Sequence, residues 1–257
     1  MKKNKIKELW RQEKPAVMGW CASGNPYIAE LMANSGYDAL VIDWQHGVGV
    51  SQTSVVSCIQ AIGNTDTVPI VRLPKNEPDY ISYVLDAGAY GVIVPMVNSK
   101  DQASAAGRAC RYAPEGNRSI AGNRPALSVG LDEYVAHANE EMLCLVMIET
   151  KQALDNVEDI ATAEHIDGLY IGPSDLSLDM GLSLSGWPDD ERHIDACRKV
   201  LSAAQAAGVV PCHHGAGPAE GAKFIEMGFK LCQIGSDIKM LTAAAGSGVK
   251  SFKELLS

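Results

Sequence analysis

The chain has 257 residues, 46% of them hydrophobic and 21% charged, a composition that is ordinary for a globular protein and excludes a disordered one. Its formal net charge of −9 at pH 7 argues against nucleic acid or an anionic membrane surface as a partner. The length suits one (β/α)8 barrel, and no shift in composition divides residues 1–257 into two domains.

The cysteines and the first residues of the chain indicate the cellular compartment. The seven cysteines are odd in number, form no Cys-x-x-Cys motif and lie in several cases inside apolar runs, as reduced core thiols do. Residues 1–7 are basic but lack the apolar stretch of a signal peptide, and no segment is apolar over a membrane-spanning length. We therefore expect a cytoplasmic protein that binds no membrane.

Eight apolar runs, each followed by a helical pattern, are expected to form strands. They lie at residues 17–22, 39–44, 67–73, 91–97, 143–149, 169–171, 209–212 and 231–234. Such alternation predicts an α/β fold in which a parallel sheet closes into a (β/α)8 TIM barrel. An open, doubly wound sheet is the alternative, and the number of strands disfavours it.

Helix boundaries can be predicted from capping residues and glycines. Asn25, followed by a proline, and Asn76 are expected to begin two helices. Glycine separates a helix end from the next strand in four places, which suits the left-handed conformation that ends a helix; these are Gly36, Gly88, Gly208 and Gly228. Residues 113–130 break the rhythm, because they are too rich in Gly, Asn and Pro for a plain connection, and long loops of this kind are usually functional or disordered.

Two acids follow neighbouring strands, where a barrel enzyme carries its chemistry. Glu149 ends the run at 143–149, and Asp175 comes just after the strand that stops at Gly172-Pro173. Each acid alone is more simply a helix cap or half of an ion pair, but the two together favour a site for Mg2+ or Mn2+. Mg2+ or Mn2+ is favoured over zinc here, because the sequence has no His/Cys ligand spacing.

Arg72 and His46 are the other candidates at strand ends. Arg72 offers a planar fork of donors for a carboxylate or an enolate oxygen, or else it forms a structural salt bridge to Glu149 or Asp43. His46 is a proton carrier that Asp43 or Asp86 can orient, unless it is simply a hydrogen-bonded structural residue. No lysine lies inside a predicted strand or directly at its end, which argues against a Schiff-base aldolase.

Taken together, these segments resemble the HpcH/HpaI family of metal-dependent aldolases that act on 2-oxo acids. The matching segments are residues 41–47 (VIDWQHG), 71–74 (VRLP), 85–88 (LDAG), 94–97 (VPMV), 116–119 (GNRS), 148–150 (IET), 172–177 (GPSDLS), 179–181 (DMG) and 235–237 (GSD). They run nearly end to end, and it is their combination that makes the resemblance specific.

The resemblance implies a fold, an assembly and a reaction. It implies a (β/α)8 barrel in a homo-oligomer, a hexamer or a trimer, with the last helix packed on a neighbouring subunit. It also implies retro-aldol cleavage of a 4-hydroxy-2-oxo acid to pyruvate, or a close 2-oxo acid, and an aldehyde. The cofactor would be Mg2+, Mn2+ or Co2+ on Glu149 and Asp175.

Residue roles also come from the resemblance. Pyruvate would bind at Arg72 and Asp175 and along the backbone of Gly172, Pro173 and Ser174. Arg72 would steady the enolate, and His46 would act as the base, with Asp43 and Asp86 as its partners.

The sequence departs from the family pattern in two places. Gln45 stands where many members carry glutamate, which removes a charge beside His46. His213 and His214 stand where members have small or apolar residues, so they contact either a polar or anionic aldehyde or another subunit. Two other functions stay open, a citrate-lyase-type acyl-CoA or phosphoenolpyruvate lyase and a non-catalytic barrel that binds a 2-oxo acid.

Overall fold

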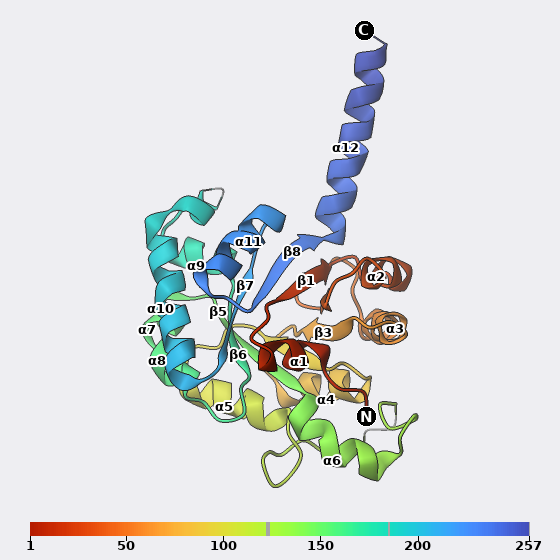
Figure 1. Cartoon of the computed structure of the whole chain (residues 1–257), viewed down its shortest axis with the longest axis vertical. Coiled ribbons are helices and arrows are strands. Elements are labelled where there is room, and N and C mark those ends of the chain that lie inside the picture. Colours follow the sequence, from red (N-terminus) through yellow and green to blue (C-terminus); the bar gives the residue numbers. More distant parts are fainter. Residues whose placement is uncertain (122–123, 185, 257) are drawn as a thin grey trace.

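In this computed structural model, which describes residues 1–121, 124–184 and 186–256, parallel strands close into a barrel (Figure 1). They are β1 (Ala16–Cys21), β2 (Ala39–Asp43), β3 (Val68–Arg72), β4 (Gly91–Val94), β5 (Leu143–Ile148), β6 (Gly168–Ile171), β7 (Val210–His214) and β8 (Leu231–Ser236). Each strand pairs with the next, and β8 returns to β1. The (β/α)8 prediction is therefore confirmed, and the open sheet is excluded.

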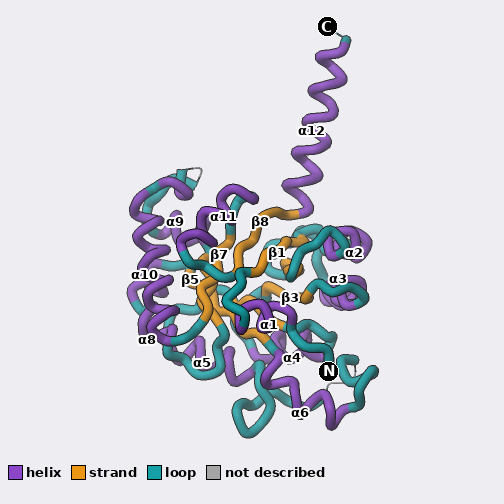
Figure 2. The backbone as a smooth tube through the Cα atoms, in the orientation of Figure 1, coloured by secondary structure: helices purple, strands orange, loops and turns teal. Residues whose placement is uncertain are grey.

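Helices cover the outside of the strands (Figure 2). The α-helices are α1 (Lys5–Arg11), α2 (Pro26–Ala33), α3 (Gln52–Gly63), α4 (Pro78–Asp86), α5 (Lys100–Ala109), α6 (Leu131–Glu141), α7 (Lys151–Asp155), α8 (Val157–Ala161), α9 (Pro173–Asp179), α10 (Glu191–Ala207), α11 (Pro218–Met227) and α12 (Asp237–Leu255), with a short 3-10 turn, η1 (Trp187–Asp189). No helix in the described part of the chain combines the length and apolar character needed to cross a bilayer.

The predicted glycine positions are confirmed by their backbone conformation. Gly36, Gly88, Gly208 and Gly228 have φ angles of +96°, +101°, +74° and +116°. Each lies between a helix and the following strand, where a side chain would strain the left-handed backbone. These glycines let the chain turn back into the barrel four times.

Two predicted caps have different outcomes. The side chain of Asn25 accepts hydrogen bonds from Tyr27 N and Ile28 N, as expected of a helix cap. Asn76 is not a cap, because α4 begins at Pro78 and Glu77 precedes it in an extended conformation. A residue before proline is held out of the helical region, so the helix cannot begin earlier.

The core has two layers. One lies inside the barrel and includes Met18, Val41 and Tyr170; the other lies between the strands and the helices and includes Leu40, Ile59 and many more. Because successive side chains of a strand point to opposite faces, neighbouring residues in one strand enter different layers. This alternation decides which side chains reach the pocket described below.

The segment 113–130 contains a buried arginine, although residues 122 and 123 lie outside the described part. Arg118 donates to Asp86 Oδ1 at 2.7 Å and to Tyr134 Oη at 3.2 Å, and its guanidinium lies 4.5 Å from the centre of the Tyr112 ring. The described part of this segment is thus tied to the end of α4 and to α6.

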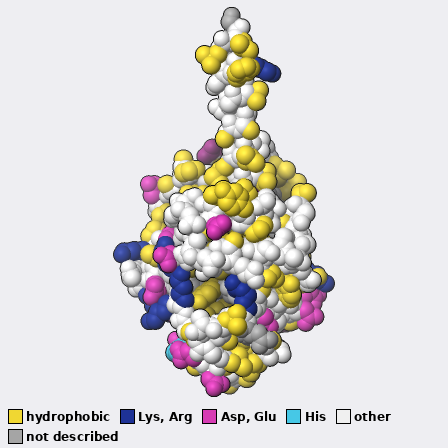
Figure 3. All heavy atoms as spheres, turned by 90° about the vertical axis from the view of Figure 1, so that its right-hand side faces the viewer, with side chains coloured by type: hydrophobic (Ala, Val, Ile, Leu, Met, Phe, Trp, Pro, Cys, Tyr) yellow, Lys and Arg dark blue, Asp and Glu magenta, His cyan; other side chains and the backbone are white. Residues whose placement is uncertain are grey.

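The last helix, α12, projects away from the barrel (Figure 1). Its apolar side chains are exposed, among them Leu241 (66%), Phe252 (63%) and Leu255 (85%), and Figure 3 shows hydrophobic side chains along it. The expected packing of this helix on a neighbouring subunit stays a prediction.

Candidate active site

A cavity of about 250 Å3 opens at the carboxyl ends of the strands, slightly smaller than the clefts of about 300–1,000 Å3 that hold drug-sized ligands. Its size therefore suits a small organic acid. The cavity is lined by Trp20, Asp43, His46, Arg72, Met147, Gly172, Pro173, Ser174, Asp175, His214, Gln233, Ser236 and Lys239.

Asp43 and Arg72 form the buried centre of this pocket. They end the neighbouring strands β2 and β3, where they are paired in register. Arg72 Nε donates to Asp43 Oδ1 at 2.9 Å, and Arg72 Nη2 donates to Oδ2 at 2.6 Å. This two-bond arrangement fixes the plane of the guanidinium. Of the alternatives left open for Arg72, the structure gives the salt bridge to Asp43, and Arg72 also lines the pocket.

Two further groups hold the Asp43 carboxylate. Trp20 Nε1 donates to Oδ2 at 3.1 Å, and the backbone N–H of His46 donates to Oδ1 at 3.1 Å. Burial alone would raise the pKa of Asp43, but the hydrogen bonds and charge of Arg72 outweigh it, so the pKa is lowered. Asp43 therefore stays ionised at neutral pH.

Glu149 lies beside the pocket at the end of β5. The residue is 2% exposed, and its Oε1 accepts a hydrogen bond from Met96 N at 2.6 Å. A side chain at Gly172 would come within 2.8 Å of Glu149 Oε2, so the glycine lets this carboxylate lie against the start of α9. The absence of a Cβ at position 172 thus makes room for Glu149.

The environment of Glu149 fits a divalent cation. Burial raises the pKa of its carboxyl, the Met96 N–H opposes this shift, and the nearby charge of Asp175 raises the pKa further. Two carboxylates that repel each other at the edge of a small cavity are stabilised when a hard cation binds between them.

His46 stands at the pocket rim on the turn after β2. This turn is tight, since a side chain at Gly47 would meet the Asp43 carbonyl oxygen at 2.3 Å. The His46 side chain is exposed and lines the pocket. Asp43 bonds the backbone of His46 rather than its ring, so the expected orientation of the imidazole by Asp43 is not observed.

Asp86 does not reach this pocket within one chain. It is the last residue of α4, and its carboxylate pairs with Arg118. Barrel helices run antiparallel to the strands, so the end of α4 lies at the amino edge, opposite His46. A single chain does not bring Asp86 to His46, so the expected role of Asp86 as a partner of His46 stays a prediction.

The two adjacent histidines of β7 lie on opposite faces of the strand. His214 points into the pocket, where Nδ1 lies 3.1 Å from Tyr170 Oη and the ring meets Trp20 edge-on at 4.6 Å. Burial, with the charges of Arg72 and Lys239 adding to it, lowers the pKa of His214 to about 3. His214 is therefore neutral at pH 7, whereas His213 faces the helix layer.

Four pocket residues were not singled out from the sequence. Trp20 and Met147 belong to strands and point inward, Gln233 does the same in β8, and Lys239 lies in the first turn of α12. A two-residue alternation along β1, β5 and β8 would have identified the first three. Gln233 Oε1 is buried and has no hydrogen-bond partner among the described residues.

The closed parallel barrel and its pocket of acids, an arginine and histidines define a (β/α)8 barrel with a candidate active site for a small molecule. The family model described as HpcH/HpaI aldolase/citrate lyase matches residues 16–244, so the chain belongs to this family. Enzymes of the family generally depend on a divalent metal ion.

Two curated relatives cover nearly the whole chain. A hydroxypyruvate/pyruvate aldolase of Rhizorhabdus wittichii is 38% identical over 244 residues, 94% of this chain and 96% of the relative. A 2-keto-3-deoxy-L-rhamnonate aldolase of Salmonella gallinarum is 35% identical over 258 residues, 99% of this chain and 95% of the relative. The protein is accordingly a carbon–carbon lyase of the aldolase type.

A solved structure agrees with the barrel described here. A HpcH/HpaI aldolase/citrate lyase family protein from Burkholderia cenocepacia superposes with a TM-score of 0.88 at 29% identity, covering 97% of this chain and 99% of that protein. The similarity extends over both proteins almost completely.

Proposed function

We propose that this class II aldolase reversibly cleaves a 4-hydroxy-2-oxo acid to pyruvate, or a close 2-oxo acid, and an aldehyde. The observation that carries the proposal is the juxtaposition of Arg72, fixed by Asp43, with Asp175 in one small pocket and Glu149 beside it. The relatives named as hydroxypyruvate/pyruvate and 2-keto-3-deoxy-L-rhamnonate aldolases support the choice of a 2-oxo acid.

Glu149 and Asp175 would hold the divalent cation, Mg2+, Mn2+ or Co2+. When bound, the cation supplies Lewis acidity to the keto group of the substrate. The backbone at Gly172, Pro173 and Ser174 begins α9. Pro173 has no N–H and the Gly172 N–H donates to the Ile148 carbonyl oxygen, so the Ser174 N–H in the first turn of α9 would donate to the carboxylate of the 2-oxo acid.

Arg72 and His46 would carry out the remaining steps. Cleavage of the bond between C3 and C4 leaves negative charge on the keto oxygen, and a guanidinium already fixed by Asp43 can stabilise that charge without reorganising. His46 moves the proton that leaves the 4-hydroxyl group or returns to C3. Asp43 acts on Arg72 rather than on the His46 ring.

The citrate-lyase-type alternative has less support. A coenzyme A ester requires a basic, nucleotide-sized surface, whereas the pocket holds about 250 Å3 and the chain carries a net charge of −9. Both curated relatives described above are named as aldolases.

We also propose a homo-oligomer, a trimer or a hexamer, that works in the cytoplasm. The exposed apolar residues of α12 support the assembly. The cysteines in the described part of the chain are all free and buried, which suits a reducing compartment.

The reaction is tested with a panel of aldehydes, pyruvate and Mg2+, Mn2+ or Co2+, scored for aldol formation. Glu149→Ala or chelation with EDTA should abolish pyruvate release from a 4-hydroxy-2-oxo acid. Glu158→Ala is the matched control, because this glutamate is exposed and pairs only with Lys199 among the described residues. Turnover that survives both EDTA and Glu149→Ala would contradict the metal-dependent mechanism.

A further inference from the structure

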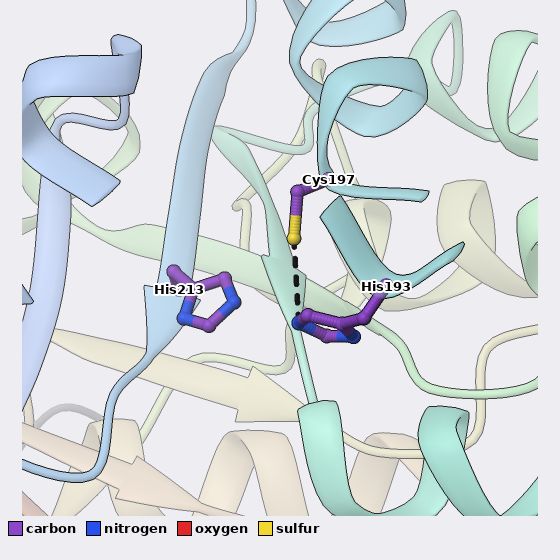
Figure 4. A group of neighbouring side chains, drawn as sticks. All are labelled: His193, Cys197 and His213. Atoms are coloured by element: carbon purple, nitrogen blue, oxygen red, sulfur yellow. Dashed lines mark hydrogen bonds between the residues drawn. The ribbon is translucent and has the colours of Figure 1, made fainter. Parts of the chain in front are cut away.

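Three side chains of the metal-binding type meet outside the pocket, between the barrel and its helices. They are His193 and Cys197 of α10 and His213 of β7, and each is 0% exposed. One ligand atom from each lies within 4.8 Å of the other two. Figure 4 shows the three side chains around a common space.

The placement follows from the periodicity of two packed elements. His193 and Cys197 are four residues apart in α10, so they lie on one face of that helix, and this face is buried. His213 points outward from β7 because its neighbours Cys212 and His214 point inward. A helix and a strand of the barrel wall thus supply all three ligands, and the sequence spacing alone does not reveal them.

The polar atoms of this cluster are poorly satisfied. One hydrogen bond lies within the cluster, between Cys197 Sγ and His193 Nε2 at 3.4 Å (Figure 4). His193 Nδ1 and both ring nitrogens of His213 have no hydrogen-bond partner among the described residues. A buried polar group without a partner is destabilising, because it has lost its hydrogen bonds to water and gained none. Packing alone gives no reason for placing two imidazoles here, where an apolar side chain avoids that cost.

Aromatic rings hold the imidazoles in place. The His213 ring stacks on Phe224 with centroids 3.6 Å apart and meets Phe229 edge-on at 5.4 Å. Trp187 of η1 packs against His193 at 4.7 Å. Burial lowers the pKa of His193 to about 4 and holds that of His213 well below its usual range, so both rings are neutral at pH 7. Neutral imidazoles have the free lone pair that a metal needs.

We propose that His193, Cys197 and His213 bind one thiophilic cation, Zn2+ or Cu+. Metal–nitrogen bonds of about 2.0–2.1 Å and metal–sulfur bonds of about 2.3 Å in a tetrahedral site place N and S ligands about 3.5 Å apart, close to the 3.4 Å separation of Cys197 and His193. The ligand atom of His213 lies within 4.8 Å of the other two, so the three ligand atoms would move closer together when the ion binds. Thiolate and imidazole select these ions over Mg2+.

Binding of the cation releases one proton from the site. The Cys197 S–H bond breaks, the sulfur forms the bond to the metal, and the proton passes to solvent. Both histidines contribute lone pairs and release none. The site differs from Glu149 and Asp175, whose oxygen ligands suit hard cations. A bound ion would join α10 to β7 next to His214, which lies in the catalytic pocket.

The experiment uses Co2+ as a spectroscopic probe on the full-length protein, first stripped of metal and then saturated with Mg2+ to occupy the oxygen ligands. We expect a thiolate-to-cobalt charge-transfer band in the near ultraviolet that saturates at one Co2+ per chain and disappears when Zn2+ is added. A parallel anaerobic titration against a chromophoric Cu+ chelator decides which of the two ions binds more tightly.

Variants assign the band to this cluster. Cys197→Ser should remove it, and His193→Gln should weaken Co2+ binding about 100-fold through the loss of one ligand. Cys58→Ser is the matched control, since Cys58 is also a buried helical cysteine but lies in α3, and its band should be unchanged.

The proposal would be overturned by the absence of a charge-transfer band in the wild-type protein, or by an equal band in Cys197→Ser. If Cys197→Ser does not fold, the wild-type titration and His193→Gln still decide, because the oxygen ligands of the pocket produce no thiolate band. A wild-type band with unchanged affinity in His193→Gln would also reject the assignment.

Discussion

Asp43 connects three parts of the candidate active site through its carboxylate. Its two oxygens accept hydrogen bonds from Arg72, Trp20 and the backbone of His46, which belong to β3, β1 and the turn after β2. The guanidinium is therefore held before substrate arrives, and the free edge of its fork is available to an oxygen. Such preorganised donors are the main source of electrostatic stabilisation in transition states.

Arg72→Lys should separate the effect of the fixed planar guanidinium from the effect of a positive charge alone. Lysine keeps the positive charge but lacks the planar fork, so it cannot pair with both oxygens of Asp43 and face the substrate. We expect kcat to fall about 100-fold or more, the loss typical of one oxyanion donor. The affinity for Mn2+, measured by calorimetry, should change only a few-fold. Equal losses in kcat and in metal affinity would place Arg72 with the metal ligands instead.

The direction in which each element runs decides which predicted site residues meet. Asp43 and Arg72 end strands and Asp175 lies shortly after one. Eight parallel strands predicted from the sequence therefore already place all three at one edge of the barrel, where they line one pocket. Asp86 ends a helix and therefore lies at the other edge. The partners of Asp86 and the meeting of α10 with β7 at His213 depend on packing between distant segments, which periodicity cannot specify.

The projecting helix α12 leads to a prediction about subunit assembly. Without a contact to another subunit, this helix of 19 residues would lack tertiary contacts over much of its length. Its apolar residues, Leu241 and Phe252 among them, would then stay exposed to water. We expect Phe252→Asp to lower the molar mass in light scattering from that of an oligomer toward that of one chain.

Lys250→Ser is the control for this substitution, since Lys250 is 79% exposed and pairs with Glu254 on the same helix. Its molar mass should match that of the wild type. An unchanged molar mass in the double variant Leu241→Asp/Phe252→Asp would mean that α12 makes no subunit contact.

For the whole molecule, burial of the proposed metal ligand Glu149 lowers the stability of the metal-free protein at neutral pH. Glu149 is buried with its pKa raised by desolvation and by Asp175, so in the metal-free protein its ionised form is penalised relative to the unfolded chain. Below the ordinary glutamate pKa of about 4.5 both states are protonated and there is no penalty. As pH rises from there through the raised folded-state pKa, the unfolded chain loses its proton first and the folded state loses stability.

Glu149→Gln should therefore stabilise the metal-free protein at pH 7, because the amide removes the charge while its oxygen can still accept the Met96 N–H. The melting temperature in EDTA should be higher for the variant than for the wild type, and the difference should vanish as pH falls toward 4. Adding Mn2+ at 100 times its Kd should stabilise the wild type by about 2.7 kcal/mol and leave the variant unchanged. A metal-free variant that melts below the wild type at pH 7 would mean that Glu149 stabilises the fold, and its burial would then need an explanation other than metal binding.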